Sequence, residues 1–440
     1  MGHFRAHICH SPNRGTIERI QDALVSVDDD GSITDIRTMD ESTKVPIDTV
    51  DLRGQGVLLP GFVDLHIHAP QFPQLGQALD KPLEDWLFGY TFPLEAKFAD
   101  INYADEVYTA LVDTLLANGT TTAIYFATTH VPASLRLAEI CIDKGQRAFV
   151  GRVAMDDPDG CPDYYRDQDA ATAVKDTADF IDQLRTLPGN HEGQVEPIIT
   201  PRFIPACSDD ALKGLGKLAA EKGVAIQTHC SESDWAHSHV LERCGVTDTS
   251  ALDGFGLLTR RTVLAHSNFI SDADMDLIAK RGAGVAHCPL SNIYFANSVF
   301  PLRHALEKSV HVGLGTDISG GPSASMLDSC RGAIGSSRML EDGVDPALPA
   351  NTRGRADSRI DFRDAFWLAT AGGAEVMDLL VGQFTPGYQF DAILVKLPES
   401  FMVGTDETPD PDALLEKTLM LAQSHDVKAT WVAGRQVYGA

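Results

Sequence analysis

The middle of this chain alternates regularly between apolar runs typical of β-strands and longer stretches with the spacing of amphipathic helices. Helical spacing occurs, for example, at 104–117, 132–144, 171–187 and 209–222. The strand-like runs are 57–68, 121–128, 148–156, 195–203, 224–229, 262–266, 283–287 and 310–317. Because strands that alternate with helices form parallel sheets, and eight repeats close into a barrel more readily than they extend an open sheet, we expect an α/β fold with a TIM-like (β/α)8 barrel.

The residue types at the ends of the helical stretches agree with this division. Serines stand where N-caps belong and glycines where helices end, at Ser208, Ser271, Gly119, Gly145, Gly223 and Gly282. Short strand-like runs also occur near both ends of the chain, at 6–9, 23–36, 391–397 and 430–438. We therefore expect residues 1–55 and 388–440 to form a small β-sandwich subdomain, and residues 56–387 to form the barrel.

Composition excludes several classes of function. The chain carries 36 Lys and Arg against 62 Asp and Glu, a net charge of −26. Because binding to a nucleic-acid backbone requires a basic face, we exclude nucleic acid and expect a small-molecule substrate. Much of the acidity, such as 28–30 and 406–412, is typical of solvated surface turns.

The cellular compartment follows from what the sequence lacks. No apolar run approaches the ~20 residues that a membrane span needs, and the first residues lack the apolar segment of a signal peptide. The eight cysteines form no CxxC pair, and we interpret them as reduced thiols, mostly in the core. We expect a cytoplasmic protein with no membrane partner.

Polar side chains gather at the carboxyl ends of the expected strands, where barrel enzymes carry their catalytic groups. They are His66 and His68 on the first strand, Arg202 on the fourth, His229 on the fifth, His266 on the sixth and Asp317 on the eighth. Each of them alone has an ordinary structural explanation. Independent structural histidines, however, have no reason to fall at the same end of three strands. Imidazoles with a carboxylate suit Zn²⁺, so we predict a zinc site.

Some nearby positions remain open. His130 and His287 resemble the ligand positions and could lie just outside the metal's own ligands, whereas we interpret Cys288 as packing. The insertion 72–100 after the first strand is too long for a simple connection, and we expect it to shape the active site. It is rich in aromatic residues, namely Trp86, Phe88, Tyr90, Phe92 and Phe98.

Several motifs carry a family resemblance. PGFVDLHIHAPQ (60–71), with QTHCSE, LAHS, HCPLSN and GLGTD, resembles the metal-dependent amidohydrolase superfamily. WLFGYTFPLE, GTTTAIYFAT, GQRAFVGRVAMD, TPRF and GLGTDISGG are similar to the guanine deaminase family within it. The resemblance extends over nearly the whole chain, and these motifs together are far more specific than the HxH pair.

The resemblance implies an activity and a set of site residues. It implies zinc-dependent hydrolytic deamination of guanine to xanthine and ammonia by a homodimer with one Zn²⁺ per subunit. The implied zinc ligands are His66, His68, His229 and Asp317. The implied substrate-binding residues are Gln71, Arg202, Phe203, Glu232 and His266, and the implied catalytic residues are Glu232, His266 and Asp317. Glu232 would protonate the ring and the departing amine, while Asp317 and His266 would orient the attacking water and accept its proton.

Substrate preference follows from the same positions. Arg202 offers forked donors that match the O6 and N7 acceptors of guanine, and adenine presents an amino donor there instead. Phe203, with aromatic residues of the insertion, could stack on the purine. Leu290 and the segment 294–300 depart from the family pattern, which keeps open another aminated heterocycle, such as a triazine, a pterin or a modified purine.

Two further alternatives carry less weight. A hydrolase that opens a cyclic amide often uses two metals bridged by a modified lysine, and no lysine ends the fourth strand. A barrel that only binds partners would be expected to have lost part of the catalytic set. All of His66, His68, His229, Glu232 and Asp317 are present.

Overall fold

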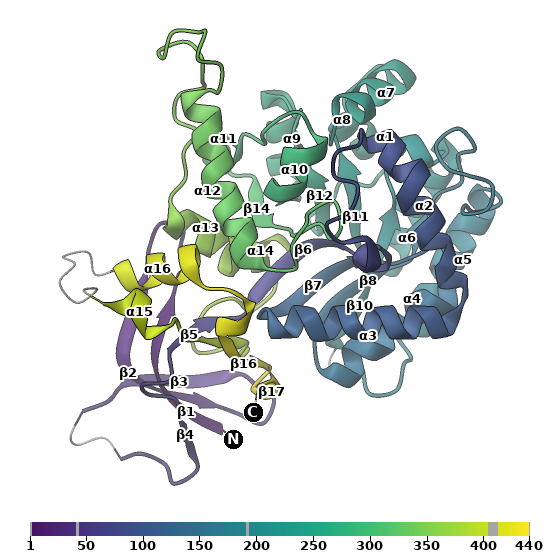
Figure 1. Cartoon of the computed structure of the whole chain (residues 1–440). Coiled ribbons are helices and arrows are strands. Elements are labelled where there is room, and N and C mark those ends of the chain that lie inside the picture. The colour runs from purple at the N-terminus through teal and green to yellow at the C-terminus, as the bar shows by residue number, and fades with distance from the viewer. Residues whose placement is uncertain (1, 41–43, 191–192, 404–411, 440) are drawn as a thin grey trace.

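Eight parallel strands form a barrel at the centre of the computed structural model, which describes residues 2–40, 44–190, 193–403 and 412–439 (Figure 1). In sheet order they are β6 (Phe62–His68), β7 (Thr120–Phe126), β8 (Arg147–Gly151), β10 (Val195–Pro201), β11 (Ala225–Cys230), β12 (Thr262–His266), β13 (Gly284–His287) and β14 (His311–Leu314). The short β9 (Val153–Ala154) continues the run of β8 and pairs with β10. The α/β barrel expected from the alternation is confirmed.

The barrel closes between its first and last strands. The backbone amide of Asp317 donates to the carbonyl of His66 at 2.9 Å, and the amide of His68 donates to the carbonyl of Ile318 at 2.8 Å. These bonds tie the end of β6 to the residues after β14. Three of the four residues predicted to hold zinc therefore lie at the seam of the barrel.

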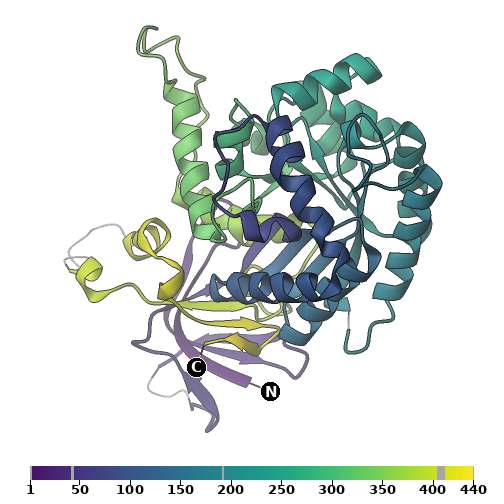
Figure 2. The same cartoon turned by 45° about the vertical axis from the view of Figure 1, so that its right-hand side comes forward.

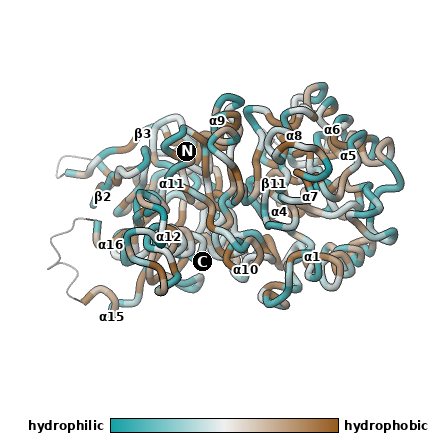
Figure 3. Tube along the Cα trace, turned by 90° about the horizontal axis from the view of Figure 1, so that it is seen from above, coloured by the Kyte–Doolittle hydropathy of each residue, from teal (hydrophilic) through white to brown (hydrophobic). Residues whose placement is uncertain are grey.

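Helices cover the outside of the barrel (Figure 2), and hydrophilic and hydrophobic residues are interspersed along the chain (Figure 3). They include α3 (Ile101–Ala117), α4 (Val131–Lys144), α5 (Ala170–Leu184), α6 (Asp209–Lys222), α7 (Asp234–Cys244), α8 (Asp248–Gly254), α9 (Asp272–Arg281), α10 (Pro289–Phe295), α11 (Leu302–Glu307), α12 (Met326–Asp342), α13 (Phe362–Ala369) and α14 (Ala371–Val376). The predicted serine caps are confirmed: Ser208 accepts from the amide of Ala211, and Ser271 forms a capping box with Asp274. The four predicted glycines all have positive φ at helix ends.

The insertion after β6 folds into a chain of short helical turns. These are η1 (Ala69–Gln74), α1 (Leu83–Trp86), η2 (Leu87–Thr91), α2 (Phe92–Glu95) and η3 (Ala96–Ala99). Residues from three of these turns line the cavity at the carboxyl ends of the strands. This placement is consistent with the expectation that the insertion shapes the active site.

Strands from both ends of the chain meet in one second sheet, and the N- and C-termini lie close together (Figure 1). Its order is β17 (Arg435–Tyr438), β16 (Val427–Val432), β15 (Ala392–Val395), β5 (Val57–Pro60), β1 (Gly2–His10), β2 (Glu18–Val27) and β3 (Ile33–Thr38), with β4 (Thr49–Asp51) beside β1. The stacked rings of Phe4 and Phe390, with Trp431 edge-on to Phe4, form part of its core. The division at residues 1–55 and 388–440 against 56–387 stays a proposal.

Several of the expected strand-like runs differ in extent from the observed strands, and the runs 57–68, 148–156 and 430–438 each contain two strands. The run 57–68 is divided at Gly61, so that β5 belongs to the second sheet and β6 to the barrel. A Cβ at Gly61 would meet the Thr121 hydroxyl at 2.2 Å, so only glycine fits where the chain crosses between the sheets. The run 430–438 is a hairpin of β16 and β17, because Ala433 and Gly434 take positive φ and turn the chain.

Surface features agree with most of the composition arguments. All eight cysteines are free and seven of them are buried, which confirms that they lie mostly in the core. Asp29 and Asp30 are exposed as expected, but Asp412 is buried and pairs with Arg363 at 2.9 Å, so its assignment to solvated surface was wrong. Residues 406–411 of that acidic stretch lie outside the described residues. Among the described residues, no helix is long and apolar enough to cross a membrane.

Candidate active site

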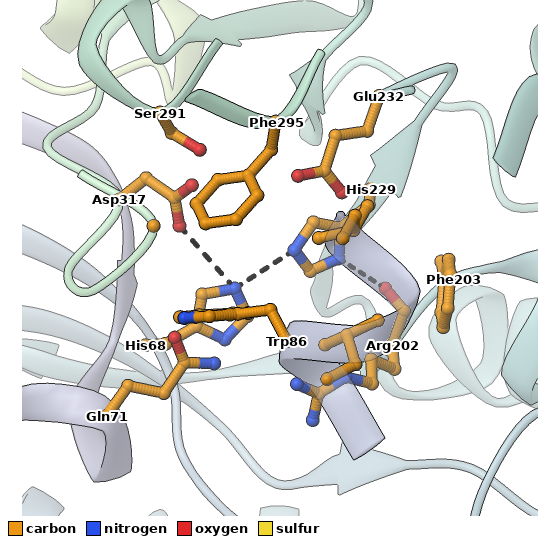
Figure 4. Close-up of a pocket in the computed structure, with 13 residues that line it drawn as sticks. His68, Gln71, Trp86, Arg202, Phe203, His229, Glu232, Ser291, Phe295 and Asp317 are labelled. Carbon is orange, nitrogen blue, oxygen red and sulfur yellow. Dashed lines mark hydrogen bonds and ion pairs between the residues drawn. The ribbon is translucent and has the colours of Figure 1, made fainter. Parts of the chain in front are cut away.

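Three histidines and an aspartate converge at the carboxyl end of the barrel, as the strand-end pattern predicted. Figure 4 shows His68, His229 and Asp317 of this cluster. His66 and His68 come from β6, His229 from β11, and Asp317 follows β14. The Nε2 atoms of His68 and His229 are 2.9 Å apart, and Nε2 of His66 lies 3.2 Å from Oδ1 of Asp317. One ring nitrogen from each of the three histidines lies within 4.8 Å of the others.

The electrostatics of this cluster fit a bound cation. Burial lowers the pKa of His66, His68 and His229 well below that of a free imidazole, so their rings are neutral. Nε2 of His66 is buried without a hydrogen-bond partner. Nδ1 of His229 donates to the backbone carbonyl of Arg202 at 2.6 Å, which turns its Nε2 toward the cluster. Neutral imidazoles oriented in this way, together with a carboxylate, are the ligand set that Zn²⁺ prefers.

A buried carboxylate beneath the cluster supports this arrangement. Asp64 accepts hydrogen bonds from the amide and hydroxyl of Thr316, at 3.0 and 2.5 Å, and from the amide of His66 at 3.3 Å. Its complete burial raises the pKa of this carboxyl to about 7. Asp64 thereby fixes β6 to the residue before Asp317.

Backbone strain is concentrated at the same end of the strands. Ser231, His266, Ser267 and Asp317 all have positive φ, between 45° and 67°. Residues other than glycine rarely adopt this conformation, and they persist in it where surrounding contacts impose it, most often at functional sites. The strain therefore marks the ends of β11, β12 and β14 as a shaped site.

Glu232 and His266 lie beside the cluster. Burial, followed by the charge of Asp317, raises the pKa of Glu232 to about 8. Nε2 of His266 lies 3.5 Å from Oε1 of Glu232 and 3.8 Å from Oδ2 of Asp317. Because Nδ1 of His266 faces the amide oxygen of Asn292 at 3.0 Å, the proton of its neutral ring sits on Nδ1 and leaves Nε2 as an acceptor.

Aromatic rings line part of the adjoining cavity. The rings of Trp86 and Phe295 both line it, with centroids 5.1 Å apart. The lining residues are His68, Gln71, Leu83, Trp86, Leu87, Arg202, Phe203, His229, Glu232, Ser291, Phe295, Asp317 and Gly320.

Not every aromatic residue of the insertion lies at the site. Phe88 and Tyr90 are 43% and 44% exposed, and Phe92 and Phe98 are buried in the core. Only Trp86 of the five lines the cavity, because consecutive helical turns send neighbouring side chains in different directions. The expectation that the aromatic residues of the insertion act together at the substrate was too broad.

The remaining candidates from the sequence are His287, His130 and Cys288, and they differ in how close they lie to the cluster. His287 is fully buried beside Phe300, and burial, with His266 nearby, lowers its pKa to about 3. His130 instead precedes α4 and packs against Tyr165, outside the cavity lining. Cys288 is a buried thiol near His66 and His266, and burial raises its pKa well above the usual value.

The divergent segment after β13 contributes to the cavity through residues that the sequence did not single out. Ser291 and Phe295 of α10 line it. Leu290, which departs from the family pattern, points instead toward α12, where it lines a separate surface cavity. Helical spacing explains the difference, because residues 291 and 295 lie one turn apart on the same face.

A buried glutamate was also missed by the sequence reasoning. Glu95, the last residue of α2, is fully buried and forms a two-point ion pair with Arg202, with N–O distances of 2.7 and 3.1 Å. Its Oε1 also accepts from Nε2 of Gln71 at 2.8 Å. No signal in the sequence distinguishes Glu95 from the other acids of the insertion, such as Glu84 and Asp85.

Comparisons with known proteins agree with this geometry. The amidohydrolase family model matches residues 57–437. The guanine deaminase of Homo sapiens is 36% identical over 99% of this chain and 96% of its own length, and the probable guanine deaminase of Schizosaccharomyces pombe is 36% identical over 99% and 83%. A crystal structure of guanine deaminase from C. acetobutylicum, with guanine in its active site, superposes with a TM-score of 0.90 at 30% identity and covers 99% of this chain and 100% of that one. The chain therefore belongs to the amidohydrolase family and, within it, to the guanine deaminases.

Proposed function

We propose that this protein hydrolyses guanine to xanthine and ammonia. The observation that carries the proposal is the joint placement of a histidine-aspartate cluster, an acid with a raised pKa and a forked hydrogen-bond donor around one cavity. The full-length relatives are guanine deaminases of animals, a fungus and bacteria, and one solved relative holds guanine in its active site.

His66, His68, His229 and Asp317 would hold one Zn²⁺ per subunit. When bound, the ion supplies Lewis-acid chemistry, which lowers the pKa of a water ligand from 15.7 to about 7 and so provides a nucleophile at neutral pH. Asp317 and Nε2 of His266 face the same point, where they would orient the attacking water and take up its proton.

Glu232 would carry protons on the substrate side. A carboxyl with a raised pKa holds a proton near neutral pH, which suits a general acid. In the proposed reaction, Glu232 protonates the ring nitrogen next to C2 as the water adds to that carbon. Glu232, now a carboxylate, takes the proton of the hydroxyl group added at C2 and passes it to the amino group. Ammonia leaves as the C2 carbonyl forms, and the proton taken up by Asp317 and His266 returns Glu232 to its acid form.

The side of the cavity opposite Glu232 would recognise the purine. With C2 at the histidine cluster, the O6 and N7 edge of guanine points away from it, toward Arg202 and Gln71. Phe203 is 5% exposed and lines the same cavity, where its ring can cover a face of the purine. The amino group of adenine would leave the buried donors unpaired, which can cost ~10⁴-fold in kcat/KM.

The experiment that tests this function is a substrate panel. Purified, zinc-loaded protein is incubated with guanine, adenine, and aminated pterins and triazines, and ultraviolet spectra are followed while ammonia is quantified. We expect xanthine and ammonia from guanine, and no turnover of adenine. If guanine is inert while another panel member releases ammonia, the substrate assignment is wrong although the hydrolytic chemistry survives.

Removing the metal should abolish turnover and lower stability. Dialysis against a chelator is expected to reduce bound metal from about one equivalent to near zero, because His66, His68 and His229 are grouped to bind it. A ligand at 100 times its Kd contributes ~2.7 kcal/mol of stability, so the melting temperature should fall as well. Elemental analysis, activity and thermal melts are measured before and after chelation, and again after zinc is restored. Full activity in protein without bound metal contradicts the assignment.

We also propose a cytoplasmic homodimer. Seven buried reduced cysteines suit a reducing compartment. Ile293 and Tyr294 of α10 and Met339 of α12 are 43–57% exposed beside the apolar surface cavity lined by Leu290, and a second copy could cover them. Sedimentation equilibrium should give twice the chain's mass of 47.5 kDa, and a monomer at micromolar concentration contradicts the proposal.

A further inference from the structure

The buried carboxylate of Glu95 contacts both Gln71 and Arg202, which line the side of the cavity away from Glu232. Oε2 of Glu95 lies 2.7 Å from Nη1 of Arg202, and Oε1 lies 3.1 Å from Nη2 of Arg202 and 2.8 Å from Nε2 of Gln71. Glu95 is 0% exposed, Gln71 1% and Arg202 2%. Figure 4 shows the Gln71 amide and the Arg202 guanidinium on the side of the cavity away from Glu232.

The three residues come from different parts of the chain. Glu95 ends α2, Gln71 lies in η1, and Arg202 follows β10. The ring of Phe92, one turn before Glu95, also lies 4.9 Å from the guanidinium carbon of Arg202. The carboxylate therefore connects both ends of the insertion to the barrel at the point where Arg202 faces the cavity.

The hydrogen bonds of Gln71 and Arg202 determine which of their polar groups face the cavity. Oε1 of Gln71 accepts from the amide of Ser319 at 3.1 Å, while its Nε2 donates to Glu95. With both ends of the amide assigned, Gln71 cannot flip without losing both of these bonds. Arg202 has five N–H groups, and its two-point pair with Glu95 leaves others free. Both residues therefore present N–H donors.

The energetics argue that this pair serves specificity rather than stability. Removing two charges from water costs about as much free energy as their mutual attraction gains. A pair of apolar side chains at these positions would therefore stabilise the fold equally well. A neutralised guanidinium, in contrast, offers rigid donors to an uncharged purine without bringing net charge to it. A role in recognition therefore accounts for the burial of Glu95 better than a contribution to stability does.

We propose that Glu95 is a positioning residue that holds Arg202 and Gln71 as fixed donors and thereby selects purines with an oxygen acceptor at C6. The inference rests on the proposed function, because it assumes that C2 of the purine lies at the histidine cluster. Loss of the carboxylate should leave the Gln71 amide held only by the bond from Ser319, so that the amide can turn and its oxygen can accept from an amino group at C6.

The test compares three purines that share the C2 amino group. Guanine has an oxygen at C6, 2,6-diaminopurine has an amino group there, and 2-aminopurine has neither. Each is measured as a substrate and as a competitive inhibitor, in wild type, Glu95→Gln and the control Glu84→Gln. Glu84 lies on α1 of the same insertion and is partly exposed.

In Glu95→Gln, we expect the KM for guanine to rise ~10- to 100-fold with a smaller change in kcat, because the lost contacts serve binding throughout the reaction. The inhibition constant of 2-aminopurine should stay within ~3-fold, and the preference for guanine over 2,6-diaminopurine should fall at least ~10-fold. Glu84→Gln should match wild type. In an Arg202→Met background, Glu95→Gln should change the guanine preference little further, since the two residues act through one contact.

The outcomes separate the possible failures. Equal weakening of all three purines, with a lower melting temperature, would assign Glu95 a purely structural role and overturn the inference. Unchanged guanine preference in a folded Glu95→Gln protein would also overturn it. If the wild type does not convert guanine, the proposed function fails instead, and the three inhibition constants still report whether Glu95 controls selection at C6.

Discussion

Glu232→Gln is expected to lower kcat for guanine by ~10²- to 10⁴-fold or more while the protein keeps its fold and its metal. The substitution preserves shape and hydrogen bonding but removes the group that exchanges protons with the ring and the departing amine. Glu232 is placed for this role 3.5 Å from His266, with a pKa raised to about 8 by burial and by Asp317. Steady-state kinetics, elemental analysis and a thermal melt give the three readouts.

The matched control is Glu242→Gln, which makes the same substitution at an exposed position of α7. It should leave kcat unchanged. A Glu232→Gln protein that contains metal and retains near-wild-type kcat contradicts the role of Glu232 as the proton carrier. A loss of metal in that variant would instead assign Glu232 to the metal site.

Arg202→Lys is expected to lower kcat/KM for guanine by ~10²- to 10⁴-fold. Each hydrogen bond from a charged group is worth ~1.5–3 kcal/mol, and lysine lacks the fork that contacts Glu95 and the purine edge together. The positive charge beside Glu95 remains, so the free energy of unfolding should change much less than in Arg202→Met. That variant leaves a buried carboxylate unpaired, which costs ~3–5 kcal/mol.

Denaturant unfolding and guanine kinetics on both variants separate recognition from stability. Arg185→Lys, at the exposed end of α5, serves as the control and should change neither quantity. A folded Arg202→Lys protein with wild-type kcat/KM for guanine would contradict the proposed contact with the purine.

The barrel could be predicted because its signals are local. Apolar runs, helical spacing, serine caps and terminal glycines each depend on neighbouring residues, and all of them agreed on the order of strands and helices. The rule that barrel enzymes use the carboxyl ends of their strands then brought His66, His229 and Asp317 together without any knowledge of distances.

What the sequence could not reveal depends on contacts between distant segments. Glu95 and Arg202 are 107 positions apart, and nothing near Glu95 indicates that a guanidinium will meet it. Asn292 reaches His266 across 26 positions for the same reason. The division at Gly61 depends on the close approach of Thr121, which only the packed barrel contains.

The most direct test of the central claim follows the fate of guanine in water enriched in ¹⁸O. Zinc-loaded protein is incubated with guanine, the xanthine formed is examined by mass spectrometry, and ammonia is counted in parallel. We predict one ammonia for each xanthine, with a single ¹⁸O atom at C2, and neither product after chelation or in Glu232→Gln. Metal-loaded, folded protein that leaves guanine intact, or that releases no ammonia from it, would contradict the assignment of this site.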